Sequence, residues 1–227
     1  MEKPEDLLSD EQIESAWGSA DFGEGVTKRD VMGSCLDVSN AKVRDFTIKK
    51  VEYKTCVSFC QIWHYSKSCP AGKAYFGLFY GENIIGVICY GEPAMRNQKG
   101  CYDADIELRR LCCIDLTPKN TESYFIGNTL KTIKKMGFKR CISLADPNFG
   151  HIGTIYKASN FQYLGREQGG GSRDIFIDGE KMHSRTAFAK FGASGYVGLK
   201  ALFPDKEIKV MDKERKHVFV YDFYNCP

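Results

Sequence analysis

The sequence predicts an α/β protein in which helices cover both faces of a mixed central β-sheet. Three features of the chain support this prediction. Two apolar, β-prone runs flank a turn at residues 81–83, as in a β-hairpin. Both arms of that hairpin are apolar on both faces, which is typical of a sheet covered from two sides. A strand, a helix and a second strand then follow one another between residues 106 and 145.

Composition limits the classes of protein to which this chain can belong. Its 227 residues suffice for one sizeable core, and 43% hydrophobic with 27% charged residues is ordinary for a soluble globular protein. The net charge is +3, so a nucleic-acid surface would have to be a local patch. No apolar run reaches the ~20 residues that cross a bilayer, and residues 1–14 are acidic and polar. We therefore expect a cytoplasmic protein without membrane contact; its oligomeric state stays open.

The ten cysteines are interpreted as reduced thiols, most of them small core residues. The chain contains no Cys-x-x-Cys pair, and the closest spacings are Cys56 with Cys60 and the neighbours Cys112 and Cys113. Because adjacent residues of a strand face opposite sides, Cys112 and Cys113 do not readily share one metal ion. We expect no zinc site.

Residues 1–40 show no sustained period and are expected to form an N-terminal arm that is partly mobile. One short helix is predicted near residues 9–17, where a Ser and a Gln have the spacing of a capping box. A strand is predicted from Phe46, followed by a helix over residues 57–65. A loop with Ser, Pro and Gly then leads into the hairpin of residues 74–93.

The predicted core continues with a strand at residues 106–116 and a helix. Asn120 or Thr121 caps this helix, which runs to about Met136 and ends at Gly137. Apolar residues recur on one face of the helix and lysines on the other, as in an amphipathic helix packed on a sheet.

A further strand is predicted at residues 141–146, and it ends in a loop that carries Asp, His and Gly. A short helix at residues 153–160 leads to a strand at residues 161–166. Together, residues 41–166 are expected to form the core domain.

Residues 167–227 are expected to form a C-terminal α+β extension packed on the core. A Gly-rich loop precedes a strand at residues 174–179, and a helical pattern broken by glycines covers residues 184–203. A basic turn and an aromatic edge strand close the chain at residues 206–224.

Polar side chains gather where the strand of residues 141–146 and the helix of residues 57–65 end. Ligands of α/β proteins bind beyond the carboxyl ends of such strands, so Asp146 is a candidate for contacting an amino group or a metal. As an alternative, Asp146 caps the turn before Pro147. His151 lies in a glycine-containing loop, where active-site and helix-capping roles both stay open. His64 and Tyr65 end the predicted helix, where the helix dipole also favours a His.

Two consecutive arginines, Arg109 and Arg110, lie inside an apolar strand, which is costly unless each contacts an anion. We predict a structural carboxylate for one and a donor or DNA phosphate for the other. Asn120 and Ser123 lie at the start of the next helix, whose free N–H groups favour an anion. Tyr156 lies close to the same end of the sheet, as an active-site residue or as core packing.

Basic side chains occur in several groups, for which a solvated surface is the common explanation. A DNA phosphate track is the alternative, with Tyr and Phe residues available to stack on bases. The residues predicted for that track are Lys181, Arg185, Lys190 and Lys216.

Five segments of the chain together resemble a known family. They are HY at 64–65, YFGLFYGENIIGVICYG at 75–91, ELRRLCCIDLTPKNTES at 107–123, LADPNFGHIGTIYKASNF at 144–161 and IDGEKMH at 177–183. They resemble the bacteriophage Mom DNA-modification proteins, whose fold is related to the GNAT-type N-acetyltransferases. The resemblance runs from about residue 46 to the end of the chain, and its most specific part is Asp-Pro-x-x-Gly-His-x-Gly-Thr-Ile-Tyr-Lys.

The resemblance implies an enzyme that modifies adenine in phage DNA at N6, adding a carbamoylmethyl group that blocks host restriction. It implies double-stranded DNA with a flipped adenine as the substrate, and catalytic roles for His64, Tyr65, Asp146, His151 and Tyr156. Tyr156 resembles the Tyr that protonates the leaving group in acetyltransferase-like folds. The resemblance also raises the hypothesis that His64, Tyr65 and Asp146 bind iron.

The chain departs from the acetyltransferase pattern at one place. Those enzymes carry an Arg/Gln-x-x-Gly-x-Gly/Ala loop that holds the pyrophosphate of coenzyme A, whereas residues 116–123 here contain no glycine. The group donor stays open, as acetyl-CoA or another activated acyl or glycyl donor. Two other functions remain as alternatives: a general N-acetyltransferase for a small amine or a protein, and a non-catalytic DNA-binding protein that blocks restriction.

Overall fold

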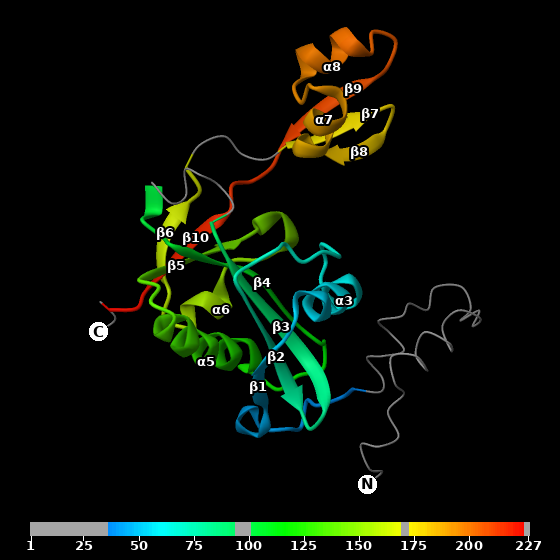
Figure 1. Ribbon diagram of the computed structural model, residues 1–227. Helices are drawn as coiled ribbons and strands as arrows, with labels where there is room; N and C mark the ends of the chain where they lie inside the picture. The colour runs from blue at the N-terminus through cyan, green and yellow to red at the C-terminus, as the bar shows by residue number, and fades with distance from the viewer. Residues whose placement is uncertain (1–35, 94–100, 169–172, 225–227) are drawn as a thin grey trace, which may run out of the picture.

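The computed structural model describes residues 36–93, 101–168 and 173–224 (Figure 1). It shows a large mixed sheet with helices, and a small sheet with two helices beyond one end of it. The predicted α/β class with a mixed central sheet is confirmed. The helix expected near residues 9–17 lies outside the described residues. Within the described ranges, no helix is long and apolar enough to span a membrane.

The first half of the described chain builds the antiparallel side of the large sheet. It holds η2 (Val43–Asp45), β1 (Thr47–Lys50), α3 (Tyr53–Trp63), β2 (Ala74–Tyr80) and β3 (Asn83–Gly91). β1 pairs with β2 and β2 with β3, all antiparallel. The turn between β2 and β3 takes two residues, so the predicted hairpin is present.

Helix α3 begins four residues before its predicted start. Its buried side chains are Cys56, Phe59, Cys60 and Trp63, at the i, i+3, i+4 and i+7 spacing of one helix face. Because Cys56 already belongs to this face, the helix begins at Tyr53. The face packs on the sheet, and the helix ends just before the first predicted site residues.

The second half of the core follows the predicted order of elements. It consists of β4 (Ile106–Cys113), α5 (Thr121–Lys135), β5 (Arg140–Ala145), η3 (Pro147–Phe149), α6 (Thr154–Lys157) and β6 (Gln162–Arg166). β4 and β5 are parallel, and α5 provides the crossover between them. Gly137, with φ of 90°, follows the end of α5 as predicted.

The N-terminus of α5 differs from the prediction in its chemistry. Asn120 stands at the N-cap position, but it takes the left-handed conformation with φ of 71° and its side chain makes no capping hydrogen bond. Instead, Thr121 Oγ1 donates to Pro118 O at 2.7 Å and Ser123 Oγ donates to Asn120 O at 3.1 Å. The left-handed residue turns the chain into the helix where a glycine is the more common choice.

Residues 173–212, termed the small module, form a unit with its own core. Its elements are β7 (Arg173–Ile177), β8 (Glu180–His183), α7 (Ser184–Phe191), α8 (Tyr196–Leu202) and β9 (Ile208–Asp212). The strands pair in the order β8-β7-β9. Ile175, Ala187 and Leu199 are fully buried between this sheet and its helices. The two helices broken by glycines are present as predicted.

The last strand, β10 (His217–Asp222), belongs to the large sheet rather than to the extension. It is antiparallel to both β5 and β6 and lies between them. The prediction of an edge strand is therefore wrong. Three consecutive buried residues, Val218, Phe219 and Val220, are typical of an interior strand covered on both faces. The small module is thus inserted between β6 and β10.

The large sheet has the order β1-β2-β3-β4-β5-β10-β6 and carries helices on both faces. Two neighbouring residues of β3 show this. The Cys89 thiol lies near the Cys56 and Cys69 thiols, on the face that α3 covers. The Tyr90 hydroxyl lies 2.8 Å from Thr129 Oγ1 of α5, on the opposite face. The predicted two-sided covering is confirmed.

The parallel strands β4 and β5 pair over only three residues and then diverge. The paired residues are Ile106–Leu108 of β4 and Cys141–Ser143 of β5. β4 continues for five residues more, paired only with β3, and a bulge places Arg109 as the extra residue of that pairing. At the point of divergence, Ser143 Oγ donates to Leu108 O at 3.2 Å. A gap therefore opens inside the sheet, on the side of the strands' carboxyl ends.

A comparison of Gly153→Ala with Gly150→Ala should show how much stability is lost to the strain of a left-handed backbone and how much to steric overlap with β10. Gly153 has φ of 79°, and a Cβ atom added there would collide with the Phe219 ring. Gly150 has φ of 75° but nothing within 4 Å of such an atom. We expect Gly150→Ala to lower the free energy of unfolding by about 1–2 kcal/mol, and Gly153→Ala by about 1–3 kcal/mol more. Urea unfolding of both variants tests this, and equal losses would contradict it.

Candidate active site

A cavity of about 280 Å³ opens in the gap between β4 and β5. Four parts of the chain line it: β4, the end of β5 with the following loop and α6, the end of α3, and the connection between β9 and β10. The lining residues are His64, Tyr65, Glu107–Leu111, Leu144–Asp146, Gly150–Tyr156 and Lys216. The cavity thus brings together predicted site residues from all four parts, namely His64, Tyr65, Arg109, Arg110, Asp146, His151, Tyr156 and Lys216.

Asp146 follows the last residue of β5 and holds the loop that borders the cavity. Its Oδ1 accepts hydrogen bonds from the backbone N–H and the side-chain amide of Asn148, at 3.0 and 2.8 Å. Its Oδ2 lies 3.9 Å from Lys216 Nζ. The turn-capping role and the cavity position that the sequence left as alternatives are therefore both present in one carboxylate.

His64 is neutral and holds a fixed orientation. It is 8% exposed, and its Nδ1 accepts a hydrogen bond from the Ser66 N–H at 3.1 Å, with Ser66 Oγ at 2.8 Å. With Nδ1 as acceptor, the neutral ring carries its proton on Nε2. Burial lowers the pKa of His64 to about 4, and the neighbouring charges of Arg110 and His151 add to this. At neutral pH, His64 is therefore a hydrogen-bond donor at Nε2.

Tyr65 joins the end of α3 to the loop after β5. Its ring centroid lies 4.2 Å from that of His64, 4.2 Å from that of Phe149 and 5.3 Å from that of His151. Burial raises the pKa of the Tyr65 hydroxyl, so the phenol stays protonated. The rings form a stack that runs from the buried His64 outward to Phe149, which the sequence did not single out.

Tyr156 lies on α6 and is buried against Phe161 and Phe219, at centroid distances of 5.6 and 5.3 Å. Burial raises the pKa of Tyr156 to about 12, although a hydrogen bond with Ser143 partly opposes the shift. The phenol therefore stays protonated at neutral pH. Core packing and lining of the cavity, which the sequence left as alternatives, occur together.

The two arginines of β4 donate to the loop that follows α3. Arg109 Nη1 donates to Ala71 O at 2.7 Å, and Arg110 Nε donates to Ser68 O at 3.0 Å. These carbonyl oxygens stabilise charged groups that lie in the wall of the cavity. A guanidinium has five N–H groups, so both arginines can also bind an anion in the cavity, which stays a prediction.

Glu107 is a cavity residue that the sequence analysis did not assign to the site. It is 6% exposed and lies on β4 where the two parallel strands still pair. The sequence contains one signal for it, an acidic residue within an otherwise apolar strand. Because two arginines follow closely in the sequence, a structural ion pair explains that acidic residue as well as a role in the site does.

Comparison with known proteins assigns the chain to a family. The sequence model of the Mom protein family matches residues 45–225. This chain belongs to the Mom family. It is 30% identical over 170 residues to the methylcarbamoylase Mom of Escherichia phage Mu, and the alignment covers 70% of this chain and 68% of that protein.

Solved structures similar to this Mom family member include two acetyltransferases. An acetyltransferase of Bacillus subtilis in complex with CoA is 11% identical, with a TM-score of 0.45, over 78% of this chain and 99% of that chain. A GNAT family acetyltransferase of Elizabethkingia anophelis with acetyl-CoA bound is 10% identical, with a TM-score of 0.43, over 79% and 99%. At these identities, neither the substrate nor the cofactor of these acetyltransferases can be assigned to this chain.

Several residues that the sequence analysis proposed for the donor or for DNA lie outside the cavity. Asn120 and Ser123, assigned to the donor, lie at the N-terminus of α5 and do not line it. Lys181 lies on β8 of the small module, where its Nζ is 2.8 Å from Asp174 Oδ2. The two other residues of the predicted DNA track in the small module, Arg185 and Lys190, lie on α7. Their roles stay predictions.

The iron hypothesis finds no support in the site of this Mom family member. Among the described residues, no group of three or more His, Cys, Asp or Glu could hold a metal ion. The lone pair of His64 Nδ1 is engaged by Ser66, and Nε2 carries the proton, so neither nitrogen is ready to bind a metal.

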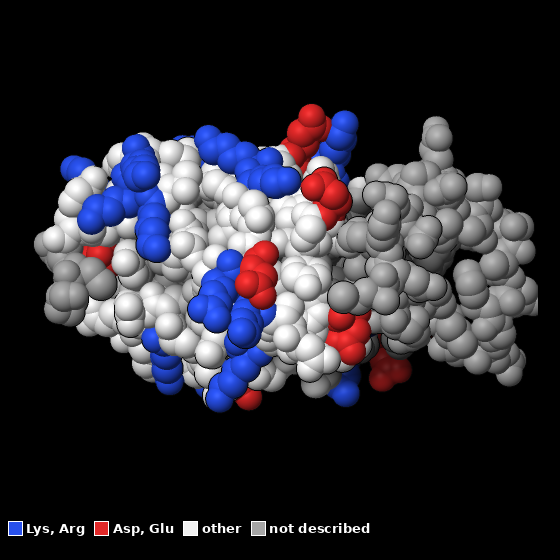
Figure 2. Space-filling view, turned by 90° about the horizontal axis from the view of Figure 1, so that it is seen from below, with Lys and Arg blue, Asp and Glu red and all other residues white. Residues whose placement is uncertain are grey.

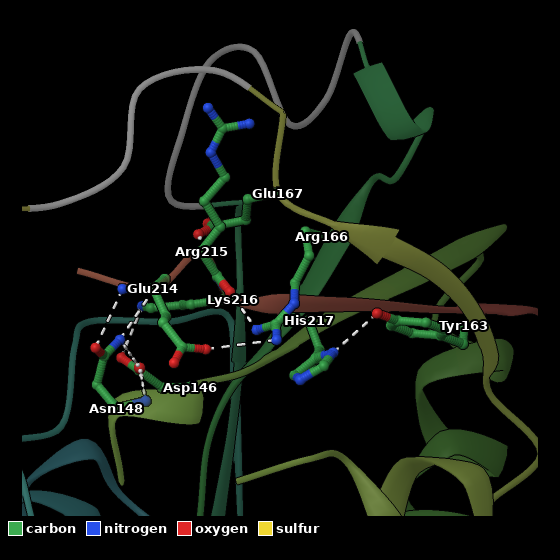
Figure 3. Close-up of polar contacts among 9 residues, drawn as sticks. All are labelled: Asp146, Asn148, Tyr163, Arg166, Glu167, Glu214, Arg215, Lys216 and His217. Carbon is green, nitrogen blue, oxygen red and sulfur yellow. Dashed lines mark hydrogen bonds and ion pairs between the residues drawn. The ribbon is translucent and has the colours of Figure 1, made fainter. Parts of the chain in front are cut away.

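Asn148 ties the site to the connection of residues 213–216, termed the strap, which leads from the small module back to β10. Its side-chain amide donates to Glu214 O at 3.0 Å, and the Glu214 N–H donates to Asn148 Oδ1 at 3.2 Å (Figure 3). The same amide donates to Asp146 Oδ1. One side chain therefore holds both the candidate catalytic carboxylate and the strap.

Removal of the His64 imidazole should change how stability depends on pH. The folded-state pKa of about 4 lies below the unfolded value of 6.5, so the unfolded chain binds the proton more readily. The stability that this group contributes is present above pH 6.5 and is lost as the pH falls toward 4. For wild type we expect a loss of about 2 kcal/mol between pH 7.5 and 5.0 from this group.

Urea unfolding at both pH values checks this, with His64→Asn as the comparison. The variant should lose less stability on acidification than wild type by about that amount. Equal pH dependence of the two proteins would show that His64 does not titrate as its buried position requires.

Proposed function

We propose that this Mom family member modifies adenine in DNA at N6, adding a carbamoylmethyl group that protects the DNA from host restriction. The observation that carries the proposal is the cavity between β4 and β5, which gathers two carboxylates, two imidazoles and two phenols. Membership of the Mom family and the relative named a methylcarbamoylase support this assignment. The reaction would take place in the cytoplasm of the phage's bacterial host.

The size and position of the cavity support one flipped base as the substrate. The N6 amino group of adenine is paired inside a duplex, so an enzyme that alters it must take the base out of the stack. A cavity of about 280 Å³ lies at the lower end of small-molecule sites. It therefore suits one base rather than an extended strand.

Two cavity residues are suited to the proton transfers of such a reaction. The N6 nitrogen loses a proton as its new bond to carbon forms, and the leaving group of the donor gains one. Asp146 would accept the hydrogen of the amino group, and Tyr156, which is protonated at neutral pH, would protonate the leaving group. His64 would donate from Nε2 to an acceptor atom of the base or the donor.

The donor stays open: attack of N6 on the carbonyl carbon of an activated acyl or glycyl compound, the class expected from the sequence, would leave an amide on N6, whereas the carbamoylmethyl product has a methylene carbon bound to N6. The N-terminus of α5 offers N–H groups to an anion, and Lys119 would assist. Glu122 in the same turn would oppose, and the segment lacks the glycines that admit a pyrophosphate. These residues fit coenzyme A poorly. A carbamoylmethyl group on nitrogen is moreover an alkyl substituent rather than an acetamide, so simple acetyl transfer does not produce it.

DNA would approach the cavity mouth rather than the underside of the core. Figure 2, seen from below, shows Lys and Arg in separate groups with uncharged and acidic residues between them. By contrast, Lys216 lines the cavity itself. The basic residues of the small module, Lys181, Arg185 and Lys190, would contact phosphates farther along the duplex.

The proposal predicts a modified nucleoside in DNA from bacteria that express the chain. Hydrolysis of that DNA and mass spectrometry of the nucleosides should show N6-carbamoylmethyl-deoxyadenosine. Asp146→Asn should lower its amount by at least about a hundredfold, since a positioned acid or base contributes about 10²–10⁴. Asp178→Asn, in an exposed turn of the small module, should leave it unchanged.

Other outcomes would replace the proposal. An acetylated amine with unmodified DNA would indicate a general N-acetyltransferase. Unmodified adenine with protection that disappears once protein is stripped from the DNA would indicate a protein that acts by occupancy.

Loss of the Tyr156 hydroxyl should slow the reaction without unfolding the protein. We expect Tyr156→Phe to reduce the modification rate by about 10²–10⁴ while keeping the ring contacts with Phe161 and Phe219. Tyr163→Phe is the control, because its hydroxyl is bound to His217 Nδ1 at 2.9 Å and Tyr163 does not line the cavity. Rates of modification of a DNA oligonucleotide measure both. A Tyr156→Phe variant as active as the control would exclude the proton-donor role.

A further inference from the structure

We propose that Phe149 and Ile152 form a wedge that enters the DNA duplex and fills the place of the flipped nucleotide. This inference rests on the proposed function, since it concerns how a paired adenine reaches the cavity. Both residues belong to the loop that joins β5 to α6 at the cavity mouth. Ile152 lines the cavity, while Phe149 lies next to the lining residues that begin at Gly150.

The first argument is exposure. Phe149 is 50% exposed and Ile152 is 61% exposed, although both are large apolar side chains within four residues of each other. Exposed apolar side chains are common singly, but a pair beside a polar cavity indicates a contact surface. Proteins that distort DNA insert Phe, Leu, Ile, Met or Pro between base steps in this way.

The second argument is the rigidity of the loop. The Phe149 and His151 N–H groups both donate to Asp146 O, at 3.1 and 3.2 Å, and the Gly150 N–H donates to Pro147 O at 2.9 Å. Asn148 is fixed to the strap through the two bonds with Glu214. A loop held by this many bonds cannot fold its apolar tips inward, so the side chains are presented to a partner.

The third argument is that the Phe149 ring packs against other aromatic rings. Its ring lies 4.2 Å from the Tyr65 ring at 31°, and Tyr65 in turn stacks on the buried His64. A side chain that separates stacked bases must offset an unstacking cost of a few kcal/mol per step. A ring braced by two others resists the displacement that such contact would impose.

The fourth argument is the charge beside the wedge. Lys213 Nζ lies 6.0 Å from the Phe149 ring centroid and is paired with Asp174 Oδ1 at 3.0 Å, whereas Arg215 of the same strap is exposed. Figure 3 shows the Arg215 side chain directed away from the Asp146 and Asn148 contacts. The acidic residue of the strap, Glu214, is paired with Arg166 at 3.5 Å. Apolar tips flanked by cations complement a duplex, whose bases are apolar and whose backbone is anionic.

The test compares Phe149→Ala and Ile152→Ala on three substrates that share a sequence which the wild type binds. The substrates are a fully paired duplex, the same duplex with an abasic site opposite the target adenine, and the single strand. We expect both variants to lose at least about tenfold in modification rate on the paired duplex. On the two substrates whose adenine is already unpaired, the loss should be no more than about twofold.

A matched control is Phe188→Ala, which removes an aromatic side chain that is 61% exposed on α7, outside the cavity lining. It should show no difference between the three substrates. Equal losses by the Phe149 and Ile152 variants on all three substrates, or none on the paired duplex, would overturn the wedge.

A second measurement does not depend on the chemistry. 2-Aminopurine placed at the target position becomes fluorescent when it leaves the stack. Wild type and Phe188→Ala should raise the signal of the paired duplex, and Phe149→Ala should raise it at least about tenfold less. Should the wild type modify no DNA at all, the proposed function fails, while this signal still decides whether the loop opens a duplex. Absence of a signal with wild type would refute the inference.

Discussion

The separation of β4 from β5 is the constraint on which the rest of the site depends. Two parallel strands that pair over three residues and then part leave backbone and side chains of both facing a gap inside a sheet. Buried backbone polar groups need partners, so such a gap is stable only where other groups complete it. Ser143 Oγ donates to Leu108 O at the point where the strands part, and the bulge at Arg109 turns β4 away. The cavity follows from this geometry.

The loop that follows α3 completes the wall, and buried thiols anchor it. The thiols of Cys69 in this loop and Cys89 of β3 both donate to Pro70 O, at 3.7 and 3.5 Å, and Cys56, Cys60, Cys69 and Cys89 are buried free cysteines that lie near one another. The loop's carbonyl oxygens hold Arg109 and Arg110, and its Ser66 fixes the His64 tautomer. The cysteines that the sequence analysis interpreted as small core residues thus also help to position the charged side of the cavity.

Much of the fold was accessible from local patterns, whereas the relations between distant segments were not. The hairpin, the strands β4 and β5 and the helix α5 each follow from the spacing of apolar residues in one segment. The position of β10 between β5 and β6 depends on non-local pairing, which no local pattern encodes. Local patterns placed Asp146 and His64 only at the ends of their own elements, and the resemblance alone put them in one site. The topology of the sheet is the physical reason that both line one cavity.

The insertion of the small module has a consequence for synthesis. Residues 173–212 leave the ribosome after β6 but before β10, which must then slide between two strands that were made earlier. Until that happens, β5 and β6 each present an open edge, the kind of surface on which nascent chains associate with one another. Assembly of the large sheet during synthesis therefore waits until the small module has been made and β10 can pair with both strands.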